Sequence, residues 1–437
     1  MPLMELNWFS PLPPAGTDIA HYTARVLPAL AERASVTLWT DRDSWDKALE
    51  SYAEVRRYSL ERPPWAELNR AEASVYHLGN NPLFHGSIWQ LSRLSPGVVV
   101  LHDLRLHHFF DGLYRVKWRD LDGYLAVMEK YYGEQGRLDA LDCYRQEARN
   151  IDRMAELYPL TRLATENALG VLVHTREGFA QLKGEHACPL AYAPLPYPSQ
   201  PGPEIGPAKV GPPFRLIVFG YLGRNRRLDA LLTALSEFPQ REQFRLDIYG
   251  QVLDDNRPLR ARIRELGLKR QVSLHGFVPE AELDQALRGA HLAVNLRYPT
   301  MGEASGSQLR IWSHALPSLV TDVGWYAGLP TETIARVRPE QEIQDIKTHL
   351  DAFLKAPEAF ARMGQRGRAL LEQEHAPEAY AQAILDFAGV AHRHAPHAAA
   401  RKLAQRAGAL MGDWTDEKSG ANHFQRVAAE ILTLTKG

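Results

Sequence analysis

Two groups of residues in the second half of the chain are suited to holding an anion. The run Gly302-Glu-Ala-Ser-Gly-Ser307 follows a predicted strand and precedes a predicted helix. A glycine-bearing turn of this kind directs unpaired backbone N–H groups at an anion. Arg226 and Arg227 come six and seven residues after Gly220, which ends another predicted strand. Because arginine binds two phosphate oxygens in a fixed geometry, the pattern predicts a phosphate site. An ordinary loop and a solvated basic helix start are the alternatives.

Polar residues also follow the predicted strands of the first half. His102 and Asp103 come directly after the apolar run Val98–Leu101, and Gly79-Asn-Asn81 ends another strand. A neutral imidazole can donate or accept a hydrogen bond, so His102 can contact a substrate; a strand-end histidine can equally bind a carbonyl.

The loop after the first predicted strand contains Gly16, Thr17 and Asp18 at a helix start. Backbone N–H groups there can approach a sugar or a phosphate. Plain helix capping by Thr17 or Asp18 is the alternative.

Short β-rich runs that alternate with helical stretches must position these residues. The predicted strands are Met4–Ser10, Ser35–Asp41, Ala73–Gly79, Gly97–Asp103, Gly170–Thr175, Phe214–Gly220, Phe244–Gly250, Val272–Val278, His291–Leu296 and Ser318–Val323. The predicted helices include Ile19–Ala34, Leu228–Leu235, Arg257–Leu266, Glu280–Arg288, Gln308–His314, Glu342–Leu354, Pro357–Glu374 and Pro377–Val390. Continuous apolar strands are typical of parallel sheets buried on both faces. Two such βαβ series predict an α/β protein with two doubly wound, Rossmann-like domains.

Composition along the chain predicts the domain boundaries. Residues 1–197 form an N-terminal domain with a helical insertion at about 104–167, because a connection this long is usually a functional element or a subdomain. A Pro/Gly-rich linker at 198–213 precedes a C-terminal domain at 214–375. Residues 376–437 are expected to form C-terminal helices and a tail.

Composition excludes several classes of protein. The 437-residue chain carries 51 Lys plus Arg and 52 Asp plus Glu, which argues against a protein whose main task is coating nucleic acid or an anionic membrane. The two cysteines, Cys143 and Cys188, exclude a disulfide scaffold and a cysteine-rich zinc site and fit a reducing cytosol. The sequence has no apolar stretch of about 18 residues and no basic-then-apolar leader, so we expect a cytoplasmic protein.

The insertion begins with Leu104–Trp118, a stretch that mixes aromatic and aliphatic residues with Arg105, Arg115 and Lys117. This mixture fits an interfacial amphipathic helix, a lid over an acceptor, or a buried helix. The first of these leaves room for peripheral contact with the inner face of a membrane.

Several segments, in order along residues 1–390, resemble those of the retaining, family-4-type (group 1) glycosyltransferases. The segments are Ser10–Tyr22, Val98–Asp103, His174–Glu177, Phe219–Leu232, Leu274–Val278, Arg297–Ser307 and Ser318–Trp325. The resemblance implies a GT-B fold, in which two Rossmann-like domains face a central cleft. It also implies transfer of a sugar from a GDP- or UDP-linked donor to a hydroxyl acceptor with retention of configuration, in glycan or glycoconjugate assembly.

The resemblance assigns roles to individual residues. The implied catalytic residues are His102, Arg226 and Glu303. The implied donor-binding residues are Gly16, Arg226, Arg227, Gly250, Phe277, Val278, Glu303, Ser305, Gly306, Ser307 and Arg310. The implied acceptor-binding residues are Thr17, Asn80 and Asp103.

Several positions depart from the family pattern: Tyr221 stands at the family's usual arginine position, and Thr17 or Asp18 stands where the family often has glycine. Arg226 stands where the family usually has lysine, and Arg224 is a reserve candidate for the same phosphate. Glu303 matches the first glutamate of the family's Glu-x7-Glu motif, which contacts the sugar. The second glutamate, a ribose ligand, is replaced by Arg310. Ribose recognition must therefore differ, and Arg310 becomes a candidate phosphate or nucleotide contact.

Other sites receive less support. Asp41-Arg-Asp43 spells a metal motif of another transferase fold but is read as a loop, and His102, His107 and His108 lack a convincingly spaced metal partner. Gly220-Tyr-Leu-Gly223 lacks the third glycine of a dinucleotide fingerprint. No cofactor and no metal are expected.

The expected partners are a nucleotide sugar and a glycan, lipid-linked or protein acceptor, without nucleic acid; a homo-oligomer is left open. A sugar-nucleotide epimerase and a nonenzymatic subunit with a degenerate site are the alternatives.

Overall fold

The computed structural model describes residues 3–145, 150–185, 187–199, 211–251, 256–412, 426–427 and 429–430. Most of the expected linker 198–213 lies outside these residues. The described chain divides into two compact units. The first holds the chain up to Val173, Phe179–Ala193 and the residues from Ala381 on, and the second holds His174–Gly178 and Pro194–Tyr380. Each unit is a doubly wound α/β domain, as the sequence predicts.

A parallel seven-stranded sheet in the order β3-β2-β1-β4-β5-β6-β7 forms the centre of the first unit. Its strands are β1 (Met4–Phe9), β2 (Ala34–Thr40), β3 (Glu54–Arg57), β4 (Ala73–Leu78), β5 (Val98–Leu101), β6 (Gly170–Val173) and β7 (Leu190–Tyr192). The strand order reverses between β1 and β4, and the carboxyl ends of strands at such a point form a crevice. The loops after β1 and β4 carry the predicted acceptor residues Thr17 and Asn80.

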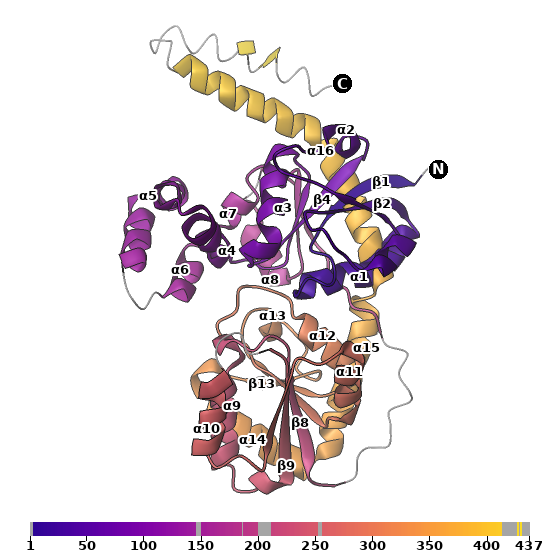
Figure 1. Ribbon diagram of the computed structural model, residues 1–437, viewed down its shortest axis with the longest axis vertical. Coiled ribbons are helices and arrows are strands. Elements are labelled where there is room, and N and C mark those ends of the chain that lie inside the picture. Colours follow the sequence, from indigo (N-terminus) through magenta and orange to yellow (C-terminus); the bar gives the residue numbers. More distant parts are fainter. Residues whose placement is uncertain are drawn as a thin grey trace. The chain divides into compact units, whose positions relative to one another are not determined.

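Helices cover this sheet, and the long insertion adds several more. The helices are α1 (Asp18–Ala31), α2 (Trp65–Leu68), α3 (Pro82–Leu94), α4 (His107–Asp111), α5 (Leu121–Arg145), α6 (Ile151–Leu157), α7 (Thr161–Ala164) and α8 (Arg176–Leu182), with a 3-10 turn at Lys47–Ser51 and a π-helical turn at Gly112–Trp118. Figure 1 shows α5 and α6 on the outer side of this unit, away from the sheet. The predicted insertion is therefore helical, and it packs onto the core through Phe109, Phe110 and Leu113.

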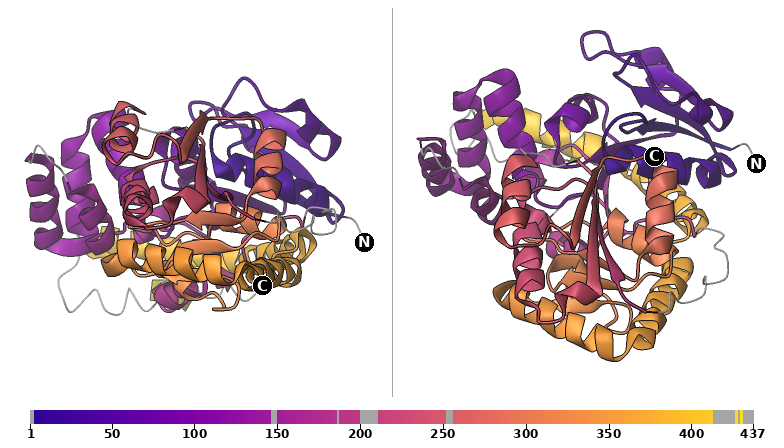
Figure 2. Two further views of the ribbon diagram at one scale, coloured as in Figure 1. Left: turned by 90° about the horizontal axis from the view of Figure 1, so that it is seen from below. Right: turned by 60° about the horizontal axis from the view of Figure 1, so that its bottom comes forward.

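A parallel six-stranded sheet in the order β10-β9-β8-β11-β12-β13 forms the second unit. Its strands are β8 (Phe214–Phe219), β9 (Phe244–Tyr249), β10 (Val272–Gly276), β11 (Leu292–Asn295), β12 (Ser318–Thr321) and β13 (Ala335–Val337). Its helices are α9 (Leu228–Glu237), α10 (Asn256–Glu265), α11 (Glu280–Gly289), α12 (Gly306–Ser313), α13 (Gly324–Ala327), α14 (Glu342–Lys355) and α15 (Pro357–Glu374), with 3-10 turns at Arg224–Arg226, Arg241–Gln243 and Pro339–Gln341. Figure 2 shows helices on both faces of this sheet.

Two glycines of α15 allow it to pack closely on α12 and the turn that follows it. A Cβ at Gly364 would lie 2.0 Å from the Ala315 carbonyl oxygen, and one at Gly367 would lie 2.2 Å from the Trp312 ring. Trp312 is fully buried. The position of α12, which carries the predicted phosphate turn, is therefore fixed by close packing along its length.

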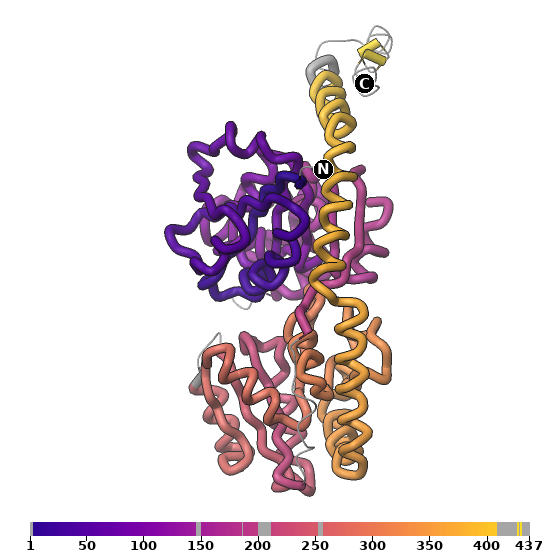
Figure 3. Tube along the Cα trace, turned by 90° about the vertical axis from the view of Figure 1, so that its right-hand side faces the viewer, coloured from indigo at the N-terminus to yellow at the C-terminus, as the bar shows by residue number. Residues whose placement is uncertain are grey.

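The long helix α16 (Pro377–Gly412) begins in the second unit and continues in the first. A Cβ at Gly170 of β6 would lie 2.8 Å from the Phe387 ring. His392 Nδ1 lies 2.7 Å from the Glu72 carbonyl oxygen, and Arg401 donates to the Ala187 carbonyl at 2.9 Å. Figure 3 shows the helix as one continuous rod. The expected division at 375–376 falls at the start of this helix, whereas its contacts join residues from Ala381 on to the first unit.

Candidate functional site

Glycines shape the carboxyl edge of the second sheet. Gly220 follows β8 with a φ of 110°, and Gly250 follows β9 with a φ of 126°. A Cβ at Gly250 would lie 1.9 Å from the Gly220 carbonyl oxygen. Only glycine fits at this position, because the two backbones approach too closely for any side chain. The predicted donor residue Gly250 thus joins the ends of two strands next to the predicted phosphate turn.

The N-terminus of α12 presents unpaired backbone donors. Ser305 is its N-cap residue, and the Ser305 hydroxyl accepts a hydrogen bond from the Gln308 N–H at 3.1 Å. Among the described residues no acceptor pairs with the N–H groups of Gly306 and Ser307. The space where a Gly306 side chain would stand is open to 4 Å. These two amides, together with the helix dipole, form a suitable site for an anion.

Arg226 brings a buried positive charge to the same turn. Its guanidinium donates to the Asn295 Oδ1 at 2.8 Å, to the Ser307 hydroxyl at 3.2 Å and to the Tyr221 carbonyl at 3.4 Å. Only 6% of the residue is exposed. The contact with Ser307 fixes the guanidinium beside the first turn of α12, so Arg226 and the α12 amides act on the same space.

Arg227 is engaged differently from its neighbour. Its guanidinium donates to both carboxylate oxygens of Glu342 at 2.6–3.0 Å. The Glu342 side chain is 4% exposed, whereas that of Arg227 is 37% exposed. The hydrogen bond that Arg227 donates to Glu342 raises the pKa of Arg227, which therefore stays charged. This pairing gives Arg227 a structural role in joining α9 to α14, and its predicted phosphate contact would require the ion pair to open.

Glu303 lies in the same loop as the α12 turn, with its carboxylate held in place. It accepts hydrogen bonds from Arg297 at 2.7 Å, the Thr300 hydroxyl at 2.8 Å and the Met301 N–H at 2.7 Å. Its side chain is 11% exposed. Three donors on two oxygens fix the carboxylate, as a residue that orients sugar hydroxyls requires.

Phe277 and Val278 follow β10, where the resemblance places the nucleotide base. Phe277 is 73% exposed, which is unusual for a phenylalanine. Val278 packs against the adjacent apolar cluster. Tyr249 and His275 stack beside them with ring centroids 4.2 Å apart. The edge therefore offers an exposed aromatic ring for a planar ligand.

Arg310 is bound to α11 by two carboxylates. Its guanidinium donates to the Asp284 Oδ1 at 2.7 Å and pairs with the Glu280 Oε2 at 2.7 Å. The residue is 7% exposed. Although burial favours the protonated acid, the hydrogen bond and charge of Arg310 lower the pKa of Asp284. Arg310 therefore ties α12 to α11, and a direct phosphate contact would compete with these pairs.

In the first unit three predicted loops meet. A Cβ at Gly79 would lie 2.5 Å from Ile19 of α1 and 3.3 Å from the Asp103 carboxylate. Gly16 is exposed at the start of α1, and Thr17 occupies the N-cap position with an extended backbone. The Thr17 side chain makes no capping hydrogen bond. The structure therefore does not show helix capping by the Thr17 side chain, which was the alternative to a ligand contact at this loop.

Asn80 and Asp103 join the loops after β4 and β5. The Asn80 N–H donates to the Asp103 carboxylate at 2.7 Å, and the Asn80 amide group bonds to the Arg105 carbonyl and the Phe109 N–H, both at 2.9 Å. The Asn80 side chain is therefore occupied in ordering the start of the insertion. Its predicted acceptor contact would use the backbone or follow rearrangement.

His102 is half-buried at the end of β5. Its Nε2 lies 3.0 Å from the Nδ1 of His77, which packs against Trp8 with centroids 4.2 Å apart. Tyr22 of α1 meets the His102 ring edge-on at 4.8 Å. A hydrogen bond between two ring nitrogens needs one donor and one acceptor, so the pair cannot be doubly protonated at these atoms.

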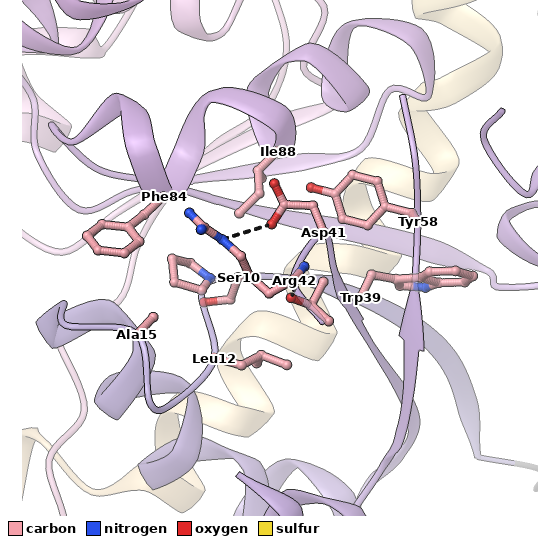
Figure 4. Close-up of a pocket in the computed structure, with 11 residues that line it drawn as sticks. Ser10, Leu12, Ala15, Trp39, Asp41, Arg42, Tyr58, Phe84 and Ile88 are labelled. Atoms are coloured by element: carbon pink, nitrogen blue, oxygen red, sulfur yellow. Dashed lines mark hydrogen bonds and ion pairs between the residues drawn. The ribbon is translucent and has the colours of Figure 1, made fainter. Parts of the chain in front are cut away.

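A small pocket of about 10 Å³ lies at the ends of β1 and β2 (Figure 4). Asp41 there accepts a hydrogen bond from the Ser87 hydroxyl at 2.8 Å and lies 3.5 Å from the Arg42 Nε. Asp43, by contrast, pairs with Arg57 at 2.7 Å. The two aspartates of Asp41-Arg-Asp43 thus serve different partners, in agreement with the interpretation as a loop. The pocket has room for about one water molecule.

Within the described ranges, no group of three or more His, Cys, Asp or Glu side chains could hold a metal ion. His107, one of the weighed histidines, is fully buried between the Tyr158 carbonyl at 2.6 Å and the Tyr124 hydroxyl at 2.7 Å. Burial lowers the pKa of His107 to about 4. It is a neutral structural residue of the insertion.

The start of the insertion is a buried helical segment, which is one of its three predicted interpretations. Its large side chains are in the core: Leu104, Leu106, Phe109, Phe110, Leu113 and Tyr114. Val116 is an exception at 62% exposed. The structure contains, over the residues it describes, no helix long and apolar enough to cross a bilayer.

Sequence reasoning missed the residues that support the site. Asn295 bonds to Arg226 and donates to Gln308 at 3.1 Å, and Arg297 and Thr300 hold Glu303. One signal was available, since a polar Asn295 ends the otherwise apolar strand β11. Such residues are expected where a strand meets a site at the carboxyl edge.

Two units of this topology define the GT-B class of fold. Residues 206–370, which lie in the second unit, match the family model of glycosyl transferases, group 1. Among curated proteins none matches the chain.

Solved structures of low sequence identity share the fold. A sucrose-phosphate synthase from Thermosynechococcus elongatus has 18% identity and a TM-score of 0.58, covering 88% of this chain and 98% of its own. Anabaena Alr3699/HepE in complex with UDP and glucose has 15% identity and a TM-score of 0.59, covering 88% and 99%. WaaG, a glycosyltransferase involved in lipopolysaccharide biosynthesis, has 17% identity and a TM-score of 0.56, covering 87% and 99%.

Proposed function

We propose that this protein is a glycosyltransferase that moves a sugar from a GDP- or UDP-linked donor to a hydroxyl acceptor with retention of configuration and without a metal. The group 1 domain in the second unit supports sugar transfer. The UDP and glucose bound by Alr3699/HepE support a nucleotide sugar as donor. WaaG, which is involved in lipopolysaccharide biosynthesis, supports a role in glycan or glycoconjugate assembly.

The observation that carries the proposal is the convergence of Arg226 and the free N–H groups of α12 on one space. A leaving nucleoside diphosphate gains negative charge as the bond to the sugar breaks. Fixed donors and a buried cation stabilise that charge without reorganisation. Both Gly306 and Ser307 contribute an unpaired N–H, and Arg226 lies 3.2 Å from the Ser307 hydroxyl. This arrangement can perform the task that a metal ion performs in other transferases.

The remaining predicted residues take the roles that the resemblance implies. Glu303, held by three hydrogen bonds, would accept hydrogen bonds from the donor sugar. His102 would line the reaction face, with the acceptor near Thr17, Asn80 and Asp103. On a front-face route the glycosidic bond to phosphate breaks, the acceptor oxygen bonds to the same face of the sugar, and the leaving phosphate takes the acceptor proton. No side-chain nucleophile is assigned.

The test is turnover of labelled nucleotide sugars by the purified protein. We expect slow donor hydrolysis, and transfer to a suitable glycan, that persist in EDTA and are lost in the Arg226→Ala/Glu303→Ala variant. NMR of the product should show the donor's anomeric configuration. Activity abolished by EDTA and restored by Mn²⁺ would contradict metal independence.

Donor binding without turnover over a broad acceptor panel would instead favour the nonenzymatic subunit. Interconversion of the free nucleotide sugar would favour an epimerase. A variant that stays folded by circular dichroism is needed for each comparison, because Arg226 is buried.

A further inference from the structure

The N-terminal ends of α11 and α12 lie on the same side of the second sheet. Leu283 and Leu287 of α11 share an apolar cluster with Ile311 of α12 and with Ile217 of β8. Each helix follows a parallel strand, so both begin at the carboxyl edge. The α11 end follows the exposed Phe277, and the α12 end carries the unpaired Gly306 amide.

Arg310 links these two helix ends, and the negative charge of its partners exceeds its own positive charge. The buried guanidinium contacts the Asp284 carboxylate at 2.7 Å, the Glu280 carboxylate at 2.7 Å and the Glu280 carbonyl at 3.2 Å. One cation and two carboxylates leave a formal charge of −1. His314 also contacts Asp284, at 3.2 Å, and burial lowers its pKa, which favours the neutral ring.

The two carboxylates differ in exposure. The Asp284 side chain is 18% exposed and that of Glu280 is 57% exposed. Asp284 alone can neutralise Arg310 in the interior. The shortest contact of Glu280 with Arg310 is through Oε2, and among the residues that the structure describes no hydrogen bond reaches its Oε1. Glu280 is thus an oriented carboxylate with one oxygen turned to solvent.

The position of Glu280 along the carboxyl edge of the second sheet fits the ribose of a nucleotide-sugar donor. Arg310 is one helical turn, about 6 Å, from Gly306. Glu280 is three residues after Phe277. If the diphosphate lies at the α12 amides and the base lies at Phe277, the ribose lies between them, beside Glu280. Carboxylates accept hydrogen bonds from ribose hydroxyls in other nucleotide-binding sites.

We propose that Glu280, oriented by Arg310, accepts hydrogen bonds from the 2′- and 3′-hydroxyls of the donor's ribose. The inference rests on the proposed function, because it assumes a nucleoside diphosphate at the α12 turn. It makes Arg310 a positioning residue rather than a phosphate ligand. It also explains how a ribose can be held although the position occupied by Arg310 carries no carboxylate.

The test compares ribose with deoxyribose. UDP and 2′-deoxy-UDP, and GDP and 2′-deoxy-GDP, are titrated into the wild-type protein, Glu280→Gln and Glu282→Gln by calorimetry. Glu282 is the matched control, since it lies in the same first turn of α11, is exposed and has the same charge. Glu280→Gln keeps the size of the side chain and an acceptor for Arg310, so the fold is expected to persist; thermal unfolding checks this.

We expect the wild-type protein to prefer the ribonucleotide by about tenfold or more, as for loss of a charged hydrogen bond. Glu280→Gln should weaken ribonucleotide binding about tenfold and bring the two affinities close together, and Glu282→Gln should change neither. An unchanged preference in Glu280→Gln, or equal losses in both variants, would overturn the inference while leaving the proposed function intact. A wild-type protein that binds neither nucleotide pair would overturn the proposed function itself, and the inference with it.

Discussion

The carboxyl edges of the two parallel sheets carry different chemistry on the same scaffold. At the second sheet, Arg226 and the α12 amides direct positive charge and backbone donors at one space. At the first sheet, the polar groups bind other groups of the same unit: the Asp103 carboxylate accepts a hydrogen bond from the Asn80 backbone N–H, and His102 contacts His77. One edge is therefore prepared for an anion, and the other is a polar surface held by hydrogen bonds within its own unit.

This difference follows from what each ligand would need. A diphosphate requires charge that is fixed in advance, because reorganising buried donors costs free energy. A hydroxyl group carries no charge, so its site can be built from donors and acceptors whose positions are set by a hydrogen-bonded network.

The second edge depends most strongly on Gly250. Gly250→Ala adds a Cβ 1.9 Å from the Gly220 carbonyl at a φ of 126°. Strain and overpacking together should lower the local unfolding free energy by more than about 3 kcal/mol. Gly267→Ala is the control, since its φ is 66° but its surroundings are open, and it should cost about 1 kcal/mol. Hydrogen exchange of the β8 and β9 amides measures the unfolding free energy of both variants. Equal costs would refute the close approach of the Gly250 and Gly220 backbones.

Acid should lower the stability of the first unit through its buried histidines. The arginines keep their charge over the same pH range. Burial lowers the pKa of His85 and of His107 to about 4. In the unfolded chain these two histidines bind protons near pH 6.5. The stability that their neutral rings contribute is therefore complete above that pH and falls as the pH decreases towards 4. The loss is on the order of 3 kcal/mol per histidine.

The variant His107→Gln should reduce the difference in unfolding free energy between pH 7 and pH 4.5, measured by urea titration. The exposed His397, replaced in the same way, is the control and should leave the difference unchanged. A wild-type protein equally stable at both values would show that these histidines are not neutral in the folded state.

Substitution of Arg226 should mainly weaken nucleotide binding, whereas substitution of Arg227 should mainly lower stability. Arg226→Gln should weaken nucleoside diphosphate binding about 10- to 100-fold, as for loss of a charged hydrogen bond. Arg227→Gln should leave affinity within about threefold but lower stability by about 1–2 kcal/mol, reduced by its partial exposure, because Glu342 loses its partner. Calorimetry and urea unfolding measure the two effects. The reverse pattern would make Arg227 the phosphate ligand.

At Asn80 the expected effect is confined to the first unit. Asn80→Ala removes two hydrogen bonds to the Arg105 carbonyl and the Phe109 N–H, which should cost the first unit about 2 kcal/mol without changing nucleotide affinity. Asn81→Ala, which removes an exposed helix cap, should cost about 1 kcal/mol. A change in acceptor KM for Asn80→Ala with no loss of stability would support a direct contact instead.

The fold could be predicted from the sequence because its central strands are continuous apolar runs. The strands β3, β7 and β13 were missed, since they are short and lie at sheet edges; β3 reads Glu54-Val-Arg-Arg57 and has no apolar run. The glycine turns of the second unit were also predictable, because few other residues suit them.

The pairing of charges could not be predicted. Glu342 is 115 positions from Arg227, and Asp284 is 26 positions from Arg310. Nothing in local spacing shows that such residues meet, because only the packing of α14 and α11 brings them together. The aromatic start of the insertion posed the same problem, since its pattern does not reveal whether protein or membrane covers Phe109 and Phe110.

The path of α16 has a consequence for biosynthesis. Phe387 fills a space against Gly170, and Arg401 binds the Ala187 carbonyl, so the first unit uses side chains that follow the second unit in the sequence. A ribosome makes the whole second unit before it reaches them. The first unit therefore stays incompletely packed until the residues from Ala381 on have been made. A fragment ending before Ala381 would leave part of its apolar surface uncovered.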